Sequence, residues 1–150
     1  MAQINTTIPD RSRPGITTTA IATADQQGGN GNYATVGQQV RKDRVTKVMR
    51  IGTLNVGTMT GRGREIADLM ERRKVQILCV QETKWKGEKA KELGGGYKLF
   101  YCGEKSDRNG VGIVLDQELK KTVIEVKRIS DRIMWMRLGI SSEIVNVVTA

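Results

Sequence analysis

The sequence predicts an α/β fold for residues 48–150, and three observations lead to that prediction. Apolar segments of strand length recur along this part of the chain, and two of them flank one segment with helical periodicity. Turn-forming residues separate the later apolar segments, which is typical of β-hairpins. This patterning begins only at Val48, and residues 1–47 are small and polar, so we expect a disordered leader before the domain.

The first predicted unit is a strand, a helix and a second strand. The apolar run Val48–Val56 predicts the first strand. Arg64–Lys74 predicts the helix, because apolar residues recur at i, i+3 and i+4 from Ile66 onward. Val75–Val80 is continuously apolar, as expected of a strand that is covered on both faces.

Hairpin strands are predicted for the rest of the chain. Residues 84–96 are rich in lysine and end in three glycines, which indicates a basic loop with a hinge. Asn109-Gly110 is a strong signal for a hairpin turn. The strands predicted around these turns are 97–102, 111–115, 122–128, 133–140 and 144–149.

Polar side chains follow both strands of the first unit. Asn55 comes at the end of the first apolar run, and Gln81 and Glu82 come after the second. Sites in α/β folds are commonly built at such strand ends, and a carboxylate there is a natural ligand for Mg²⁺. Two alternatives remain open at this point. Glu82 could instead pair with Lys84 or another cation, and Asn55 could cap a turn.

The charge favours a polyanionic partner. Lys and Arg number 25 against 16 Asp and Glu, which gives a net charge of +9 and a pI near 9.8. Nucleic acid is the first candidate partner and an anionic membrane surface the second, while an unspecialised basic surface is the alternative. Aromatic residues make up only 4% of the chain, so a row of base-stacking rings is not expected.

Several classes of site are excluded by composition. The chain has no histidine, so no mechanism that uses histidine as base, acid or metal ligand can be completed within it. Cys79 and Cys102 have neither CxxC nor zinc spacing, and Cys79 is predicted to be a buried strand thiol. No apolar stretch approaches the ~20 residues of a membrane span, and no secretory signal is present. A nuclear or cytoplasmic protein is therefore expected, without a membrane partner.

Five motifs occur in the order found in the endonuclease/exonuclease/phosphatase family, and the chain resembles that family. Residues 50–150 most resemble the apurinic-type endonuclease domain of LINE-type (RTE/BovB-like) non-LTR retrotransposons and the related craniofacial development protein 2-like sequences. The motifs are Thr53–Val56, the helix Arg64–Lys74, Gln81–Lys84, Asn109–Ile113 and Asn146–Ala150.

The resemblance implies a four-layered, DNase I-like α/β sandwich that cleaves phosphodiester bonds in DNA with Mg²⁺, or with Mn²⁺ in its place. Glu82 matches the metal-binding glutamate of the family, and Asn55 matches the asparagine that orders the metal and phosphate site. Gln81 would support them. The resemblance would also place the basic segment near the DNA backbone, although a solvated basic loop is the alternative. The lysines concerned are Lys84, Lys86 and Lys89, called the basic cluster below.

The chain also departs from the family. The Tyr-Ala-Pro sequence that follows Val-Thr-Ala in the family is absent after Ala150, as are the later Gly-Asp-Phe-Asn-like motif and the Asp-His pair. Residues 48–150 are therefore expected to be the N-terminal half of the sandwich. One sheet would then expose an apolar face, and the chain would have no activity alone because catalytic groups are missing. One alternative is a non-catalytic basic remnant that binds nucleic acid through residues 84–91 and 41–47. A lipid or inositol phosphatase is disfavoured by the charge and by residues 81–87.

Overall fold

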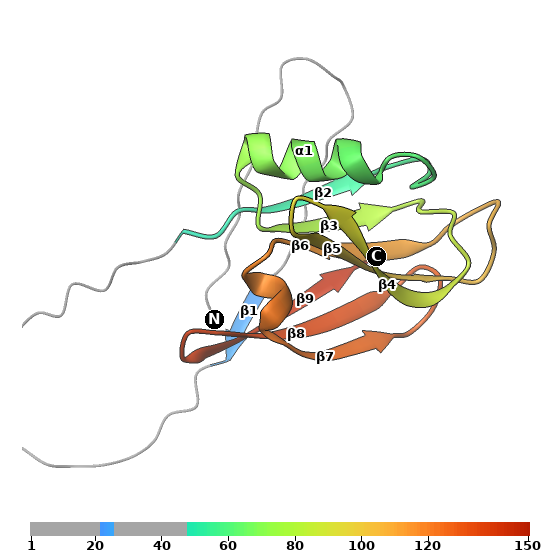
Figure 1. The fold of residues 1–150 in the computed structure, drawn as a ribbon. Helices are drawn as coiled ribbons and strands as arrows, with labels where there is room; N and C mark the ends of the chain where they lie inside the picture. Colours follow the sequence, from blue (N-terminus) through green and yellow to red (C-terminus); the bar gives the residue numbers. More distant parts are fainter. Residues whose placement is uncertain (1–21, 26–47) are drawn as a thin grey trace, which may run out of the picture.

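A helix and two β-sheets form the part of the chain that the computed structural model describes, residues 22–25 and 48–150 (Figure 1). The helix α1 (Gly63–Arg73) covers one face of a five-stranded sheet, and the other face of that sheet packs on a four-stranded sheet. The predicted α/β class is therefore confirmed. The predicted helix and all the predicted strands occur, with ends that shift by up to a few residues.

The five-stranded sheet has the order β2-β3-β6-β5-β4, and its parallel pair is β2 with β3. In that pair Asn55 lies opposite Gln81, so the polar ends of both strands are in register. The β3–β6, β6–β5 and β5–β4 pairs are antiparallel. The strands are β2 (Ile51–Asn55), β3 (Ile77–Gln81), β4 (Gly87–Gly94), β5 (Tyr97–Gly103) and β6 (Val111–Leu115).

The prediction of a basic loop over residues 84–96 is wrong for most of its length. Gly87–Gly94 is the edge strand β4, paired along its length with β5. Four of its eight residues are Lys or Glu and most of its side chains are exposed, so the sequence lacks the apolar signal of a strand. Charged residues are typical of edge strands, because they discourage pairing with another chain. The tertiary pairing with β5 therefore decides the structure here.

The four-stranded sheet has the order β1-β9-β8-β7, with every pair antiparallel. Ala22–Asp25 forms β1 against the edge of β9, so these residues depart from the leader predicted to be disordered; the rest of that leader lies outside the described residues. Backbone hydrogen bonds to an open strand edge require no apolar sequence, which is why the pattern did not predict β1. The other strands are β7 (Val123–Arg128), β8 (Met134–Ile140) and β9 (Glu143–Thr149).

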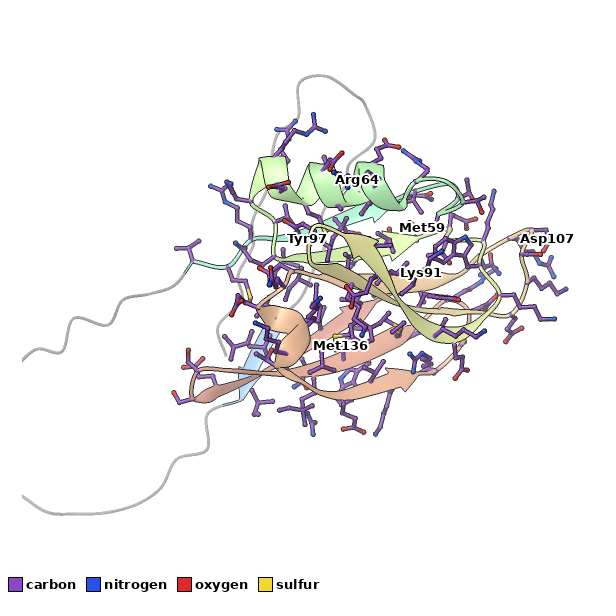
Figure 2. The ribbon with its side chains drawn as sticks, viewed as in Figure 1. Met59, Arg64, Lys91, Tyr97, Asp107 and Met136 are labelled. Carbon is purple, nitrogen blue, oxygen red and sulfur yellow. The ribbon has the colours of Figure 1, made fainter. Side chains whose placement is uncertain are left out.

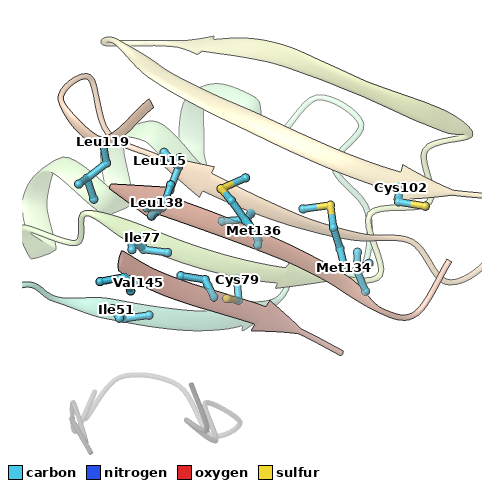
Figure 3. Close-up of a cluster of buried hydrophobic side chains, with 13 residues drawn as sticks. Ile51, Ile77, Cys79, Cys102, Leu115, Leu119, Met134, Met136, Leu138 and Val145 are labelled. Carbon is cyan, nitrogen blue, oxygen red and sulfur yellow. The ribbon is translucent and has the colours of Figure 1, made fainter. Parts of the chain in front are cut away.

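Buried side chains from both sheets meet in one core (Figure 3). Met134, Met136 and Leu138 alternate along β8 and are fully buried against β3 and β6 residues such as Ile77 and Leu115. The expectation that one sheet would expose an apolar face is wrong for these inner faces, because each sheet covers the other. It holds in part for the outer face of the four-stranded sheet, where Ile124, Ile144 and Val148 are exposed.

A second core lies between α1 and the five-stranded sheet. Ile66 and Met70, on one face of the helix, are buried with Leu99 and Val114 of the sheet. This helix anchors the sheet whose strand ends carry the predicted site. No helix among the described residues has the length and apolar character needed to span a membrane.

Candidate functional site

The carboxyl ends of β2, β3 and β9 lie together at one end of the molecule. Asn55 and Gln81 are opposite each other in the parallel pair, and Gln81 Nε2 donates to Thr149 Oγ1 of the facing sheet at 3.3 Å. Figure 1 shows these three arrowheads pointing to the same side, near the label of the C-terminus. The predicted convergence of Asn55 with Gln81 is therefore observed. Thr149, which is 68 residues after Gln81 in the chain, lies at the same place.

Gln81 ties the two sheets together at this end. Its Nε2 also donates to Thr53 Oγ1 at 3.0 Å, so one amide bridges β2 and β9. Thr149 is buried, and its hydroxyl also lies against the Cys79 thiol. Burial raises the pKa of Cys79 to about 12, which keeps the thiol protonated and inert, as predicted for a buried strand cysteine. Gln81 thus links β2, β3 and β9 at this end of the molecule.

The Asn55 side chain caps the turn after β2. Its Oδ1 accepts a hydrogen bond from the backbone N–H of Gly57 at 2.9 Å, which is the turn-capping arrangement left open by the sequence. The side chain is exposed. An amide oxygen has two lone pairs, so this bond leaves Asn55 Oδ1 able to contact a cation or a bound water as well.

Glu82 follows β3 in the left-handed backbone conformation, with φ of 57°. The side chain is half-buried, and within residues 22–25 and 48–150 its carboxylate makes neither an ion pair nor a hydrogen bond. The alternative pairing of Glu82 with Lys84 is therefore not formed. A non-glycine residue with positive φ is uncommon, and such residues cluster at functional sites.

Backbone hydrogen bonds hold the residues on both sides of Glu82. The N–H groups of Val56 and Met59 donate to the carbonyls of Gln81 and Thr83, each at 2.9 Å. These bonds fix the loop after β2 against the segment after β3. The Glu82 side chain therefore projects from a segment whose backbone is anchored before and after it.

The basic cluster lies next to Glu82 in the chain and faces solvent. Lys86 and Lys89 are exposed and Lys84 is half-buried, and none of them makes an ion pair in the described part of the protein. Lys89 lies on β4, opposite Tyr101. The exposed loop between β5 and β6 reaches the same end of the molecule, where Figure 2 labels Asp107.

The Trp85 indole is in contact with neighbouring side chains of the protein. Its Nε1 donates to Thr60 Oγ1 at 3.2 Å, and its ring meets the ring of Tyr101 edge-on with centroids 5.3 Å apart. The Lys91 ammonium lies 4.7 Å from the centroid of the Trp85 ring. With these contacts in place, the indole anchors the basic cluster to the sheet instead of offering a face for base stacking.

Few groups at the predicted site could hold a cation. Among the described residues, no three or more Cys, Asp or Glu side chains are grouped closely enough to hold a metal. Mg²⁺ is commonly held by one or two carboxylates while waters and substrate phosphates fill its other positions. Glu82, with its unpaired carboxylate, and Asn55 would be the residues that hold it.

Comparisons with known proteins give a partial likeness. No protein-family model matches the chain. Craniofacial development protein 2 from Bos taurus is 33% identical over 89 residues, and the same protein from Tragulus javanicus is 32% identical over 89 residues. Each match covers 58% of this chain and 15% of the relative, so the chain spans a small part of the relatives it matches.

One solved structure gives a further partial match. An AP endonuclease from Archaeoglobus fulgidus is 28% identical, with 61% of this chain and 38% of that chain covered and a TM-score of 0.48. The motifs around Asn55 and Glu82 had predicted a resemblance to craniofacial development protein 2-like sequences, and the sequence matches agree with it. Over the greater part of its own length, the chain is similar to craniofacial development protein 2.

Proposed function

We propose that this chain forms the metal-holding part of a Mg²⁺-dependent endonuclease that nicks DNA, of the kind carried by LINE-type (RTE/BovB-like) retrotransposons. One observation carries the proposal: the Glu82 carboxylate lies without a partner, among the described residues, where the ends of β2, β3 and β9 converge. The order of the five motifs supports the choice of family. The net charge of +9 supports a nucleic-acid substrate.

Glu82 would hold Mg²⁺, or Mn²⁺ in its place, and Asn55 would help to order the site from the end of β2. When bound, the metal would neutralise charge on a phosphate oxygen of the DNA backbone. The basic cluster would contact neighbouring phosphates, because Lys86 and Lys89 are exposed and none of the three lysines makes an ion pair in the described residues. A DNA substrate is consistent with a nuclear or cytoplasmic protein.

We further propose that the 150 residues do not cleave DNA alone. The sequence contains no histidine, and in the described part of the chain no three or more Cys, Asp or Glu side chains are grouped to hold a metal. A positioned acid or base and a transition-state donor each contribute about 10²–10⁴-fold to a rate. A site with Glu82 and Asn55 alone would therefore lose most of the acceleration.

Nicking of supercoiled plasmid with Mg²⁺ tests both parts of the proposal. We expect residues 1–150 to retain the plasmid at low salt and to give no more nicked circles than the Glu82→Ala variant. Glu88→Ala is the matched control, because Glu88 is an exposed glutamate nearby in the chain, on β4. Nicking that requires Glu82 but not Glu88 would show that the proposed inactivity is wrong. Failure to retain the plasmid would count against a DNA substrate.

A second candidate function is binding of nucleic acid without any metal-dependent step. The exposed lysines of the basic cluster favour it, because they can neutralise phosphates whether or not Glu82 holds a metal. Salt-sensitive retention of DNA that is the same with Mg²⁺, with EDTA and in Glu82→Ala would support this candidate over the first.

A further inference from the structure

Two short segments with left-handed backbone lie against each other beside the candidate site. Glu82 and Lys84 have φ of 57° and 53°, and Asn109 and Gly110 have φ of 57° and 93°. Backbone hydrogen bonds join the segments, from Thr83 N–H to the Gly110 carbonyl at 3.1 Å and from Lys84 N–H to the Asn109 carbonyl at 2.9 Å. Non-glycine residues persist in this conformation only where their surroundings hold them there.

Thr83 points inward between its two neighbours. It is fully buried, whereas Glu82 and Lys84 are half-buried, and its Oγ1 has no hydrogen-bond partner among the described residues. An unpartnered buried hydroxyl is unfavourable and calls for an explanation.

Gly110 provides the space that Thr83 occupies. A Cβ added at Gly110 would overlap Thr83 Oγ1 and would lie 3.2 Å from the Lys84 backbone nitrogen and 3.4 Å from Thr83 Cβ. Any side chain at this position would therefore push the segment after β3 away from the β5–β6 loop, quite apart from the strain of φ at 93°.

The loop between β7 and β8, from the other sheet, holds the β5–β6 loop in turn. Gly110 N–H donates to the Asp131 carbonyl at 2.9 Å, and Asn109 Nδ2 donates to Asp131 Oδ2 at 2.8 Å. The chain of contacts thus runs from Asp131 through Asn109 and Gly110 to Thr83, and ends at the backbone of Glu82.

We propose that Thr83, Gly110 and Asp131 are positioning residues, which fix the left-handed backbone of Glu82 and so aim its carboxylate at the cation. The part that concerns the cation rests on the proposed function; the part that concerns the backbone does not. Groups that orient a metal ligand commonly change metal affinity by about 10–100-fold when they are removed.

Two measurements on the full chain test the proposal. Mn²⁺ binding is followed by the electron paramagnetic resonance signal of the free ion, with Glu82→Ala as the reference for loss of the site. The backbone conformation of Glu82 is followed without metal by NMR chemical shifts and couplings. Gly110→Ala should weaken Mn²⁺ binding about tenfold or more and move Glu82 out of the left-handed region.

Rescue separates positioning from general damage. Thr83→Ala removes the Oγ1 that the new methyl would overlap, so the double variant Gly110→Ala/Thr83→Ala should recover part of the affinity and of the Glu82 conformation. If Gly110→Ala does not fold, Asp131 decides instead. Asp131→Ala should weaken Mn²⁺ binding, whereas Asp131→Asn keeps an acceptor for Asn109 and should bind nearly as well as the parent.

The possible failures are distinct. If the parent and Glu82→Ala bind Mn²⁺ equally, or if neither binds it, the proposed metal role of Glu82 is wrong, and the NMR measurement alone decides the backbone role. If Glu82 binds Mn²⁺ but the Gly110 and Asp131 variants keep both the affinity and the left-handed φ, the positioning proposal is overturned.

Discussion

Replacing the buried Thr83 by valine should stabilise the protein. Thr83 Oγ1 is buried and has no hydrogen-bond partner among the described residues, so folding removes it from water without compensation. Such a group costs about 1–3 kcal/mol, and valine has nearly the same shape without the hydroxyl. Because the added methyl lies close to Gly110, we expect a net gain near the lower end, about 1 kcal/mol.

Thr149 provides a matched control for this substitution. It is as buried as Thr83, but its Oγ1 accepts a hydrogen bond from Gln81 Nε2 at 3.3 Å. Thr149→Val should therefore lower the free energy of unfolding by about 0.5–1.5 kcal/mol, the usual contribution of one hydrogen bond. The two substitutions are chemically identical, yet they should change stability in opposite directions.

Urea unfolding followed by tryptophan fluorescence measures both effects. With a slope of about 1–3 kcal/mol per molar urea, a change of about 1 kcal/mol moves the midpoint by roughly 0.3–1 M. The midpoint should rise for Thr83→Val and fall for Thr149→Val. A fall for Thr83→Val as large as that for Thr149→Val would show instead that the Thr83 hydroxyl makes a stabilising hydrogen bond.

Three further predictions concern the core and the surface. Burial raises the pKa of Cys79 from its ordinary 9.0 to about 12, so the protonated thiol stabilises the folded state fully below pH 9, and this stabilisation is lost as the pH rises toward 12. In urea titrations the free energy of unfolding should therefore fall by about 1.4 kcal/mol per pH unit in this range, and Cys79→Ala should not show this fall. Met136→Ala, between the sheets, should cost about 2–5 kcal/mol in the same assay, whereas Ile124→Ala on the outer face should cost less than about 1 kcal/mol. Replacing the basic cluster with alanines should make the salt dependence of DNA binding shallower by about 2–3 in log–log slope. Lys121→Ala should leave it unchanged, because Lys121 follows the end of β6 that pairs with the start of β3 and is ion-paired with Glu118.

The sequence pattern predicted the helix and the β5–β6 turn, because short-range interactions determine both. The helix was predicted from apolar spacing around Ile66, and the β5–β6 connection was predicted from Asn109-Gly110, whose backbone does adopt positive φ. Strand β4 was missed because its charged side chains face solvent, and only pairing with β5 makes it a strand. Pairing within such a hairpin leaves no apolar pattern in a strand whose side chains face solvent.

The candidate site shows the same division. The register of Asn55 with Gln81 follows from two parallel strands whose polar ends were visible in the sequence. The bond from Gln81 to Thr149 could not be predicted, because it joins facing sheets across 68 residues. The left-handed backbone of Glu82 was equally hidden, since glutamate carries no turn signal and the conformation depends on contacts with Gly110.

The Mg²⁺ dependence of DNA binding shows whether Glu82 holds a metal that contacts DNA. Fluorescence anisotropy of a labelled duplex would be measured with Mg²⁺ and with EDTA, at one ionic strength, for the parent, Glu82→Gln and Glu88→Gln. We expect tighter binding with Mg²⁺ for the parent and for Glu88→Gln, and no effect of Mg²⁺ for Glu82→Gln, because a metal held between a carboxylate and a phosphate needs Glu82. Equal binding by all three proteins, with or without Mg²⁺, would show that Glu82 holds no metal that contacts DNA.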